Sequence, residues 1–304
     1  MTVADPPLPR LRGRLRPRVP LAPLTWLRVG GAAEWLFQPA DADDLAHLLR
    51  TRPPELPVVA IGVGSNLLVR DGGVPGVVVR LSRPFAGITF EDGLLVAGAA
   101  CLDQRVARAA LAMGLSGLEF MIGIPGTVGG AVRMNAGAFG GETGERLEWA
   151  EVLDPRGERH RLAARELGLG YRRSDLGGEW IVLRAAFRLT PGDPARIRAR
   201  MEEIRREREQ SQPLRVATGG STFKNPPGDK AWRLIAAAGC RGLRRGRAMM
   251  SEKHCNFLVN LGGARASELE ELGEEVRSRV RERTGVELEW EIHRIGRPPG
   301  GETS

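Results

Sequence analysis

Two short polar segments of this 304-residue chain contain groups suited to binding an anion and moving a proton. The first is Y-R-R-S at residues 171–174, where Arg172 is able to bind a carboxylate and to stabilise negative charge that develops on it. The second is G-G-S-T-F-K-N-P at residues 219–226, where Ser221 carries a hydroxyl on a glycine turn. A surface ion pair is a simpler explanation of Arg172, and a helix cap is one of Ser221, so the residues alone leave both alternatives open.

A third polar segment, L-E-W-E-I-H at residues 288–293, alternates in a pattern typical of a β-strand. In a strand, Glu289, Glu291 and His293 share one face, and a cluster of acid and base groups is suited to catalysis. The solvent-facing side of an edge strand has the same composition, and the pattern alone favours that interpretation.

Several familiar catalytic arrangements are not supported by the sequence. Ser221 lies outside any G-x-S-x-G turn, so a nucleophilic serine of the hydrolase type is not expected. His254 and Cys255 are neighbours in a segment expected to be extended, where adjacent side chains point to opposite faces, so we reject a Cys–His pair. The three cysteines are far apart and never form C-x-x-C, which predicts neither disulfides nor a metal site.

Two glycine-rich segments are candidates for ligand binding. The segment G-V-G-S-N-L-L at residues 62–68 is of a kind that presents backbone N–H groups to phosphate oxygens. Residues 117–131 contain five glycines, and M-N-A-G-A follows at 134–138, so the backbone here is able to lie flat against a planar or charged ligand. A plain β-turn explains the first segment about as well, and a buried loop explains the second.

Strands and helices must hold these segments in place. The hydrophobic patterns predict strands at residues 34–38, 57–61, 77–81, 94–97, 149–153, 160–162, 180–189, 257–260 and 287–292. They predict helices at residues 41–50, 102–113, 194–209, 232–238 and 267–283. Because strands and helices mix without regular βαβ alternation, we expect an α+β fold.

The length of the chain suits two domains. Residues 1–24 are expected to form a mobile arm, because their prolines interrupt any helix or ladder. We expect a first domain at residues 25–192, a second at 193–297 and a tail at 298–304.

The composition favours a soluble cytoplasmic protein. Forty-five basic and 37 acidic residues are interspersed, as on a solvated surface. There is neither a signal peptide nor a stretch of roughly 18 apolar residues, so we expect no membrane insertion. A nucleic-acid-binding protein is the alternative suggested by the excess of arginine. The arginine clusters at residues 10–18 and 241–247 contain no aromatic side chain for base stacking, so we expect no nucleic-acid partner.

Together the two glycine-rich segments resemble the flavin-binding half of the UDP-N-acetylenolpyruvoylglucosamine reductase family, where similar G-x-G-S-N-L-L and I-P-G-T-V-G-G-A plus N-A-G-A segments bind FAD. The segment T-W-L-R-V-G-G-A-A at residues 25–33 also resembles that family, and the resemblance extends to about Gly296. Two positions depart from the pattern: Val63 stands where a third glycine is common, and Arg133 where an apolar residue is usual.

The resemblance implies a cofactor and a fold. It implies an FAD-binding domain of the vanillyl-alcohol-oxidase-like (PCMH-type) fold, a smaller C-terminal α+β substrate domain, tightly bound FAD, and NADPH as co-substrate. The cofactor contacts it implies are Gly62, Gly64, Ser65, Asn66, Leu67, Pro125, Gly126, Thr127, Gly129, Gly130, Asn135 and Gly137. Another flavoenzyme of the same superfamily is the nearest alternative, and it would share these segments but lack the three polar ones.

The three polar segments are similar to the family's Y-R-x-S, G-S-x-F-K-N-P and L-E-x-E motifs, which makes Arg172, Ser221 and Glu291 the implied catalytic residues. The implied reaction reduces a UDP-sugar enolpyruvyl ether, a precursor of peptidoglycan, with hydride added at C3 and a proton from Ser221 at C2. The shorter-loop subtype of the family is indicated, and a monomer is expected. The implied substrate contacts are Tyr171, Lys224, Asn225, His254 and Asn256.

Overall fold

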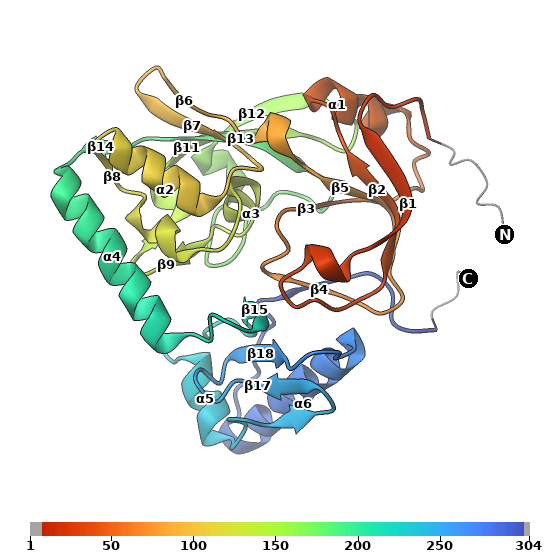
Figure 1. Cartoon of the computed structure of the whole chain (residues 1–304), viewed down its shortest axis with the longest axis vertical. Helices are drawn as coiled ribbons and strands as arrows, with labels where there is room; N and C mark the ends of the chain where they lie inside the picture. The colour runs from red at the N-terminus through yellow and green to blue at the C-terminus, as the bar shows by residue number, and fades with distance from the viewer. Residues whose placement is uncertain (1–7, 301–304) are drawn as a thin grey trace. The chain divides into compact units, whose positions relative to one another are not determined.

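The structure, a computed structural model, describes residues 8–300 (Figure 1). The helices are α1 (Ala42–Thr51), α2 (Asp103–Ala112), α3 (Val128–Arg133), α4 (Pro194–Ser211), α5 (Ala231–Ala237) and α6 (Ala266–Thr284). The strands are β1 (Arg14–Pro20), β2 (Ala32–Gln38), β3 (Val58–Ile61), β4 (Leu67–Val69), β5 (Val74–Arg80), β6 (Ile88–Glu91), β7 (Leu94–Gly98), β8 (Leu115–Ser116), β9 (Gly137–Ala138), β10 (Gly141–Glu142), β11 (Leu147–Leu153), β12 (Arg159–Ala163), β13 (Ile181–Phe187), β14 (Thr190–Pro191), β15 (Ala217–Ser221), β16 (Arg244–Arg245), β17 (Ala248–Met250), β18 (Phe257–Asn260) and β19 (His293–Ile295).

The chain divides into two compact units, each assembled from separate stretches of sequence. Within the described residues, the first unit contains 8–17, 35–62 and 76–207, and the second contains 18–34, 63–75 and 208–300. The expected linear limits of 25–192 and 193–297 therefore do not describe these units, because short N-terminal stretches pack with the C-terminal part of the chain. Those limits remain a prediction about domains in the sequence.

The first unit is built on an antiparallel sheet with the strand order β12-β11-β13-β7-β6. Its central strand β13 is buried at all positions except Arg184, as expected for a strand flanked on both sides. Helices α2 and α3 contribute Val106 and Val132 to the core, which also contains Phe187. This unit carries the second glycine-rich segment and the Y-R-R-S segment.

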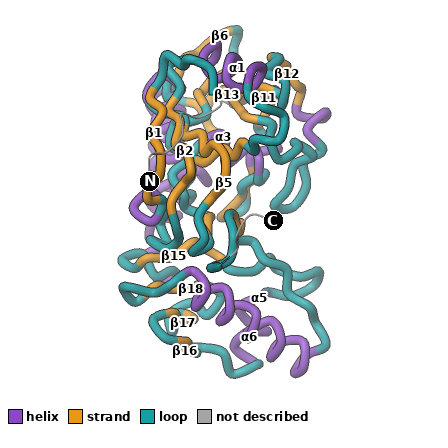
Figure 2. The backbone as a smooth tube through the Cα atoms, turned by 90° about the vertical axis from the view of Figure 1, so that its right-hand side faces the viewer, coloured by secondary structure: helices purple, strands orange, loops and turns teal. Residues whose placement is uncertain are grey.

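The second unit is built on an antiparallel sheet with the strand order β15-β18-β17-β16. Figure 2 shows α6 running beside this sheet, and Leu269, Leu272, Val276 and Val280 of that helix are fully buried. The short parallel pair of β4 and β19 also belongs to this unit and joins residues 67–69 to residues 293–295. The sheet and this pair carry Ser221 and the segment that contains Glu291.

Most elements lie where the sequence predicts them. The hairpin of β11 and β12 forms with Leu153 opposite Arg159, and β18 has the predicted limits. Helix α1 begins after Asp41, whose side chain accepts a hydrogen bond from Asp44 N at 2.9 Å, a typical N-cap.

The strand predicted at residues 287–292 is wrong. Regular pairing begins only at His293 in β19, and Trp290 forms a single bridge with Phe223. The backbone N–H groups of Glu291 and Ile292 both donate to Thr222 O, at 2.8 and 3.4 Å. Two successive donors that converge on one carbonyl form a bulge-like irregularity, so the regular alternation predicted from Glu289 to His293 is interrupted between Glu291 and His293.

The arm predicted for residues 1–24 lies partly outside the described residues, since 1–7 are not described. For the rest, the prediction that prolines prevent any ladder is wrong, because Arg14–Pro20 forms β1. This strand lies at the edge of the β1-β2-β5-β3 sheet, the position where a missing N–H is tolerated. The buried carboxylate of Asp44 also accepts hydrogen bonds from Arg12 N and Gly13 N, both at 2.8 Å, and fixes the start of this segment.

No helix within residues 8–300 is long and apolar enough to span a membrane.

Candidate active site

The first residue of the first glycine-rich segment, Gly62, meets the second segment inside the first unit. A Cβ added to Gly62 would lie 2.6 Å from Thr127 Oγ1, and one added to Gly126 would lie 2.5 Å from Asp103 Oδ2. A side chain at either position would therefore have to displace the Thr127 hydroxyl or the Asp103 carboxylate. At Gly130 an added Cβ would meet only Thr127 Oγ1, at 3.9 Å, so this side of α3 has space for another molecule.

The backbone of residues 125–130 is fixed by hydrogen bonds to the chain beneath it. Asp103 N donates to Gly126 O at 3.1 Å, and Gly129 N donates to Ala99 O at 2.9 Å. Pro125 begins this segment, which consists of apolar residues, glycines and one threonine. A fixed, glycine-lined backbone with space beside Gly130 fits the close approach of a large planar or phosphorylated cofactor such as FAD.

The Y-R-R-S segment lies against the N-A-G-A segment in the same unit. Arg172 Nη2 donates to Gly137 O at 2.8 Å, and Asn135 Nδ2 donates to Gly170 O at 3.2 Å. Asn135 is buried, and its Oδ1 accepts from Gly144 N at 2.7 Å. The structure thus brings Arg172 beside two of the predicted cofactor residues.

Arg172 has an unusual backbone conformation. Its φ is +55°, in the left-handed region that non-glycine residues rarely adopt. Its guanidinium carbon lies 5.0 Å from the ring centre of Tyr171, and that tyrosine is 48% exposed. Strained residues of this kind are frequent at functional sites because the surrounding structure holds one side chain in one direction.

In the second unit, Asn66 joins the first glycine-rich segment to Glu291. Asn66 Nδ2 donates to Glu291 O at 3.0 Å, and Asn66 O accepts from His293 N at 3.0 Å. Leu67 then pairs with His293 at the start of the β4 and β19 pair. Gly64, which precedes Ser65, has a φ of +67°, and a Cβ there would lie 2.6 Å from Leu24 O, so this loop requires glycine.

Ser221 is next to Thr222, the residue that is hydrogen-bonded to Glu291. It ends β15, opposite Phe257 of β18, and it follows Gly220, whose φ is +80°. The next residue, Thr222, accepts a hydrogen bond from Glu291 N at 2.8 Å through its carbonyl. Asn66, Ser221 and Glu291 are therefore neighbours in the second unit, although the sequence separates them widely.

Two of the predicted substrate contacts, Lys224 and Asn225, lie in the same unit shortly after Ser221. Lys224 N donates to Glu289 O at 2.8 Å, and Lys224 Nζ lies 3.1 Å from Glu289 Oε2. Asn225 Oδ1 accepts from Ala231 N at 3.0 Å and so holds the start of α5. The lysine is thus fixed three residues after Ser221.

The two other predicted contacts in the second unit are Asn256, which is buried, and His254, which is half-buried. The amide of Asn256 accepts from Phe223 N at 3.0 Å and donates to Phe223 O at 2.8 Å, so it fixes the chain after Ser221. Burial lowers the pKa of the His254 imidazole, which favours the neutral form. Its Nδ1 has no hydrogen-bond partner within residues 8–300. Substrate contact by these two residues remains a prediction.

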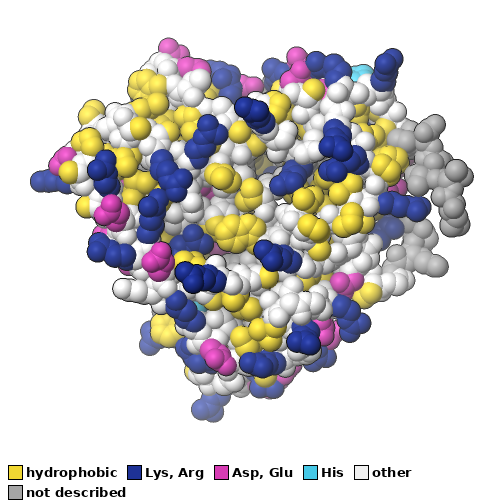
Figure 3. All heavy atoms as spheres, viewed as in Figure 1, with side chains coloured by type: hydrophobic (Ala, Val, Ile, Leu, Met, Phe, Trp, Pro, Cys, Tyr) yellow, Lys and Arg dark blue, Asp and Glu magenta, His cyan; other side chains and the backbone are white. Residues whose placement is uncertain are grey.

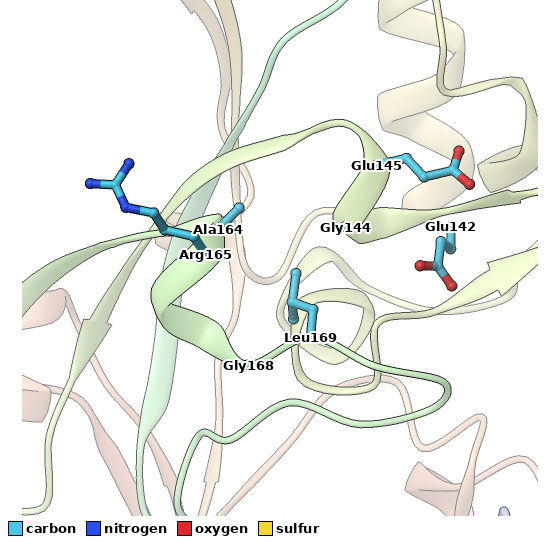
Figure 4. A pocket seen from close by; sticks show the side chains of 7 residues that line it. All are labelled: Glu142, Gly144, Glu145, Ala164, Arg165, Gly168 and Leu169. Atoms are coloured by element: carbon cyan, nitrogen blue, oxygen red, sulfur yellow. The ribbon is translucent and has the colours of Figure 1, made fainter.

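A shallow pocket of 440 Å³ in the first unit lies outside the predicted site. It is lined by Glu142, Gly144, Glu145, Ala164, Arg165, Gly168 and Leu169, none of which is a predicted site residue (Figure 4). The pocket borders the site at two points: Gly144 N donates to Asn135 Oδ1, and Glu142 of β10 pairs with Gly137 of β9.

The surface charge is dispersed. On the face shown in Figure 3, Lys and Arg side chains are spread among hydrophobic and acidic ones instead of forming one continuous stripe. Many basic side chains are paired in salt bridges, such as Arg70 with Glu270 at 2.7 Å and Arg245 with Glu271 at 2.6 Å. This pattern fits a solvated surface better than a nucleic-acid footprint.

Sequence comparisons assign both halves of the chain. The family model described as FAD binding domain matches residues 33–163, and the one described as UDP-N-acetylenolpyruvoylglucosamine reductase, C-terminal domain, matches residues 212–295. The UDP-N-acetylenolpyruvoylglucosamine reductase of Gluconobacter oxydans is 55% identical over 299 residues, which is 98% of each chain. That of Acidiphilium cryptum is 58% identical over 294 residues, 97% of this chain and 95% of the other.

A solved structure agrees with these matches. The crystal structure of UDP-N-acetylenolpyruvylglucosamine reductase from Thermus caldophilus is 42% identical to this chain and superposes with a TM-score of 0.82. The match covers 93% of this chain and 100% of the other. The predicted combination of an FAD-binding domain with a smaller C-terminal domain in an α+β fold is therefore confirmed.

Proposed function

The chain belongs to the UDP-N-acetylenolpyruvoylglucosamine reductase family, and we propose that it reduces the enolpyruvyl ether of a UDP-sugar through Arg172, Ser221 and Glu291. It is an FAD-dependent oxidoreductase that uses NADPH and serves peptidoglycan synthesis. The observation that carries the proposed roles is the hydrogen bond from Glu291 N to Thr222 O, which places the glutamate beside Ser221.

The residues proposed to hold the cofactor are described for each unit by itself. The chemistry that FAD supplies when bound is hydride transfer from NADPH to C3 of the enolpyruvyl group. In the first unit, Gly62 and residues 125–130 offer a fixed backbone, and Asn135 and Gly137 border it. In the second unit, Gly64, Ser65, Asn66 and Leu67 offer the loop before β4.

Arg172 is proposed to bind the substrate carboxylate and stabilise the charge that develops there. Addition of hydride at C3 moves an electron pair toward C2 and the attached carboxylate, which takes on enolate character. The guanidinium is held by its hydrogen bond to Gly137 O and by the left-handed backbone of its own residue. A fixed donor of this kind is worth about 3 to 4 kcal/mol in the transition state.

Glu291 assists by donating a hydrogen bond to the same developing charge, which requires its protonated form. The backbone of this residue is fixed on both sides, because its N–H bonds to Thr222 and its carbonyl accepts from Asn66. Its side chain therefore has a fixed origin beside Ser221. Preorganisation of this kind lowers the cost of ordering groups during the reaction.

Ser221 is proposed to protonate C2. A hydroxyl is a poor acid at neutral pH, so this step requires the very basic carbanion-like centre that hydride addition creates. The C2 lone pair takes the hydroxyl proton, and the resulting alkoxide is stabilised by its surroundings. The position of Ser221 at the end of β15 fixes the direction of approach.

We further infer that the protein works as a cytoplasmic monomer. Cys101, Cys240 and Cys255 are buried free thiols, which fits a reducing compartment. Size-exclusion chromatography with light scattering tests the monomer directly.

Spectroscopy of the purified protein tests the proposed function. The protein is expected to absorb as an oxidised flavoprotein, to lose that absorption when NADPH is added without oxygen, and to regain it when the enolpyruvyl UDP-sugar follows. Another flavoenzyme of the same superfamily would fail the last step. A protein without flavin absorption after reconstitution with FAD would contradict the proposal at its first step.

A further inference from the structure

One half-buried arginine in the first unit holds the chain that follows Arg172. Arg133, the last residue of α3, donates from Nη1 to Leu176 O at 3.2 Å and from Nη2 to Gly177 O and Gly178 O, each at 2.8 Å. These are charge-assisted hydrogen bonds to three successive carbonyls. One guanidinium therefore binds the backbone of residues 176–178.

The same residue contacts the loop a second time. Ser174 Oγ donates to Arg133 O at 2.8 Å, two residues after Arg172. Side chain and main chain of Arg133 thus hold residues 174–178 at four points. On the other side of Arg172, Asn135 Nδ2 holds Gly170 O.

The loop has little regular structure of its own to fix it. Between β12 and β13, the only paired strand residues described after residue 167 are Gly170 and Arg173, which form an isolated bridge across Arg172. Arg172 itself has a φ of +55°, a conformation that relaxes unless the flanking chain is held. Gly170 and Arg173 exchange two backbone hydrogen bonds of 3.1 Å, and Asp175 N donates to Leu167 O at 2.8 Å. The hydrogen bonds of Arg133 add a restraint on the chain after Arg172.

The partners of the Arg133 guanidinium within residues 8–300 are backbone carbonyls, with no carboxylate among them. Partial burial of a cation without an anion has a cost that satisfied donors reduce, and here three carbonyls accept from the half-buried guanidinium. Burial lowers the pKa of this guanidinium, which still leaves it charged at neutral pH. The hydrogen bonds of Arg133 to the carbonyls of residues 176–178 therefore indicate that its role is to hold this loop.

We propose that Arg133 is a positioning residue that fixes the 174–178 loop so that Arg172 faces the substrate carboxylate. The proposal rests on the role of Arg172 set out above. An apolar residue at position 133 would leave the three carbonyls without these donors. The side-chain type at this position is therefore a determinant of how well Arg172 is aligned in this chain.

The test measures the two half-reactions separately in the flavin-loaded protein. Arg133→Leu should slow reoxidation by the enolpyruvyl substrate by about 10- to 100-fold, the effect of a misplacement near 1 Å, while flavin content and reduction by NADPH change little. Arg133→Lys keeps a positive charge but loses the forked set of donors. Its reoxidation rate should lie between those of the unsubstituted protein and Arg133→Leu. Arg50→Leu is the matched control, because Arg50 Nη1 donates to a carbonyl of a different loop, Gly157 O at 3.5 Å, and should react normally.

A double variant separates positioning from a general structural effect. In an Arg172→Ala background, Arg133→Leu should cause no further slowing, because its effect passes through Arg172. An equal slowing in that background would overturn the proposal, and so would normal reoxidation by Arg133→Leu alone. If Arg172→Ala itself reoxidises normally, the proposed function of Arg172 fails instead.

A second route to the same loop protects the test against misfolding. If Arg133→Leu does not fold, Ser174→Ala removes one of the four restraints and leaves the Arg133 guanidinium in place. It should slow reoxidation by several-fold and should be non-additive with Arg172→Ala. Reoxidation at the normal rate by both Ser174→Ala and Arg133→Lys would then contradict the proposal.

Discussion

Gly273→Ala is expected to disturb the active site by pushing the ring of Trp290, the residue before Glu291. Gly273 lies in the middle of α6, and a Cβ there would be 2.2 Å from Trp290 Cη2 and 2.3 Å from Cζ2. The ring cannot easily yield, because Trp290 Nε1 donates to Glu274 Oε1 at 2.7 Å and its ring centre lies 5.1 Å from that of Phe223. Since Trp290 precedes Glu291, movement of the ring displaces a proposed catalytic residue.

The magnitude follows from three contributions. Overpacking of a core costs about 1 to 3 kcal/mol. Loss of the indole hydrogen bond to the Glu274 carboxylate costs about 1.5 to 3 kcal/mol if the ring moves away. Replacing glycine by alanine inside a helix restores only about 0.8 to 1 kcal/mol. We therefore expect Gly273→Ala to lower the free energy of unfolding by about 2 to 4 kcal/mol.

The assay combines denaturant unfolding of the flavin-loaded protein with the rate of reoxidation by substrate. Gly273→Ala should unfold at lower denaturant concentration and reoxidise more slowly. Trp290→Phe removes the two clashing atoms, so adding Gly273→Ala to that variant should cost much less, with a coupling of at least about 1 kcal/mol. The reasoning is refuted if Gly273→Ala behaves as an ordinary helix substitution, with higher stability and a normal reoxidation rate.

Two further predictions concern buried polar groups. Asp103 is fully buried with neither carboxylate oxygen bonded within residues 8–300, and burial raises its pKa well above the usual range. The stability linked to its raised pKa is therefore present below about pH 4 and is lost as pH rises toward the folded-state pKa, by up to about 1.4 kcal/mol per pH unit. Asp103→Asn should remove this part of the pH dependence in denaturant titrations, and an unchanged pH profile would argue against it. Asn256→Ala should leave Phe223 N and Phe223 O without their partner and lower the free energy of unfolding by about 2 to 4 kcal/mol, whereas an unchanged unfolding midpoint would show that these bonds contribute little.

Local signals were sufficient to predict much of the fold. Helix α1 carries its cap at Asp41 and acidic residues in its first turn, and α6 combines a buried apolar stripe with Gly285 in the left-handed conformation after its end. Such patterns are complete within a few residues. The strand β1 was missed because its prolines are acceptable only at a sheet edge, which is a property of tertiary structure.

The arrangement of the site was predictable in content but not in geometry. Asn66 and Glu291 are separated by 225 positions, and the carbonyl of Thr222 that joins the glutamate to Ser221 has no signature in the sequence. The same carbonyl explains why the alternating pattern before His293 failed to give a strand. Arg133 was visible in the sequence as a departure from a resemblance, but its partners lie 43 to 45 residues further along the chain.

The central claim is that Ser221 delivers the proton that completes reduction of the enolpyruvyl group. Stopped-flow spectroscopy of Ser221→Ala tests it most directly. Ser278→Ala is the control, because the hydroxyl of this partly exposed serine of α6 donates to Glu282 Oε1 on the same helix. We predict that Ser221→Ala keeps its flavin and is bleached by NADPH at the normal rate but fails to reoxidise rapidly with substrate, while Ser278→Ala is normal in both steps. Rapid reoxidation of reduced Ser221→Ala by the enolpyruvyl UDP-sugar would contradict the account.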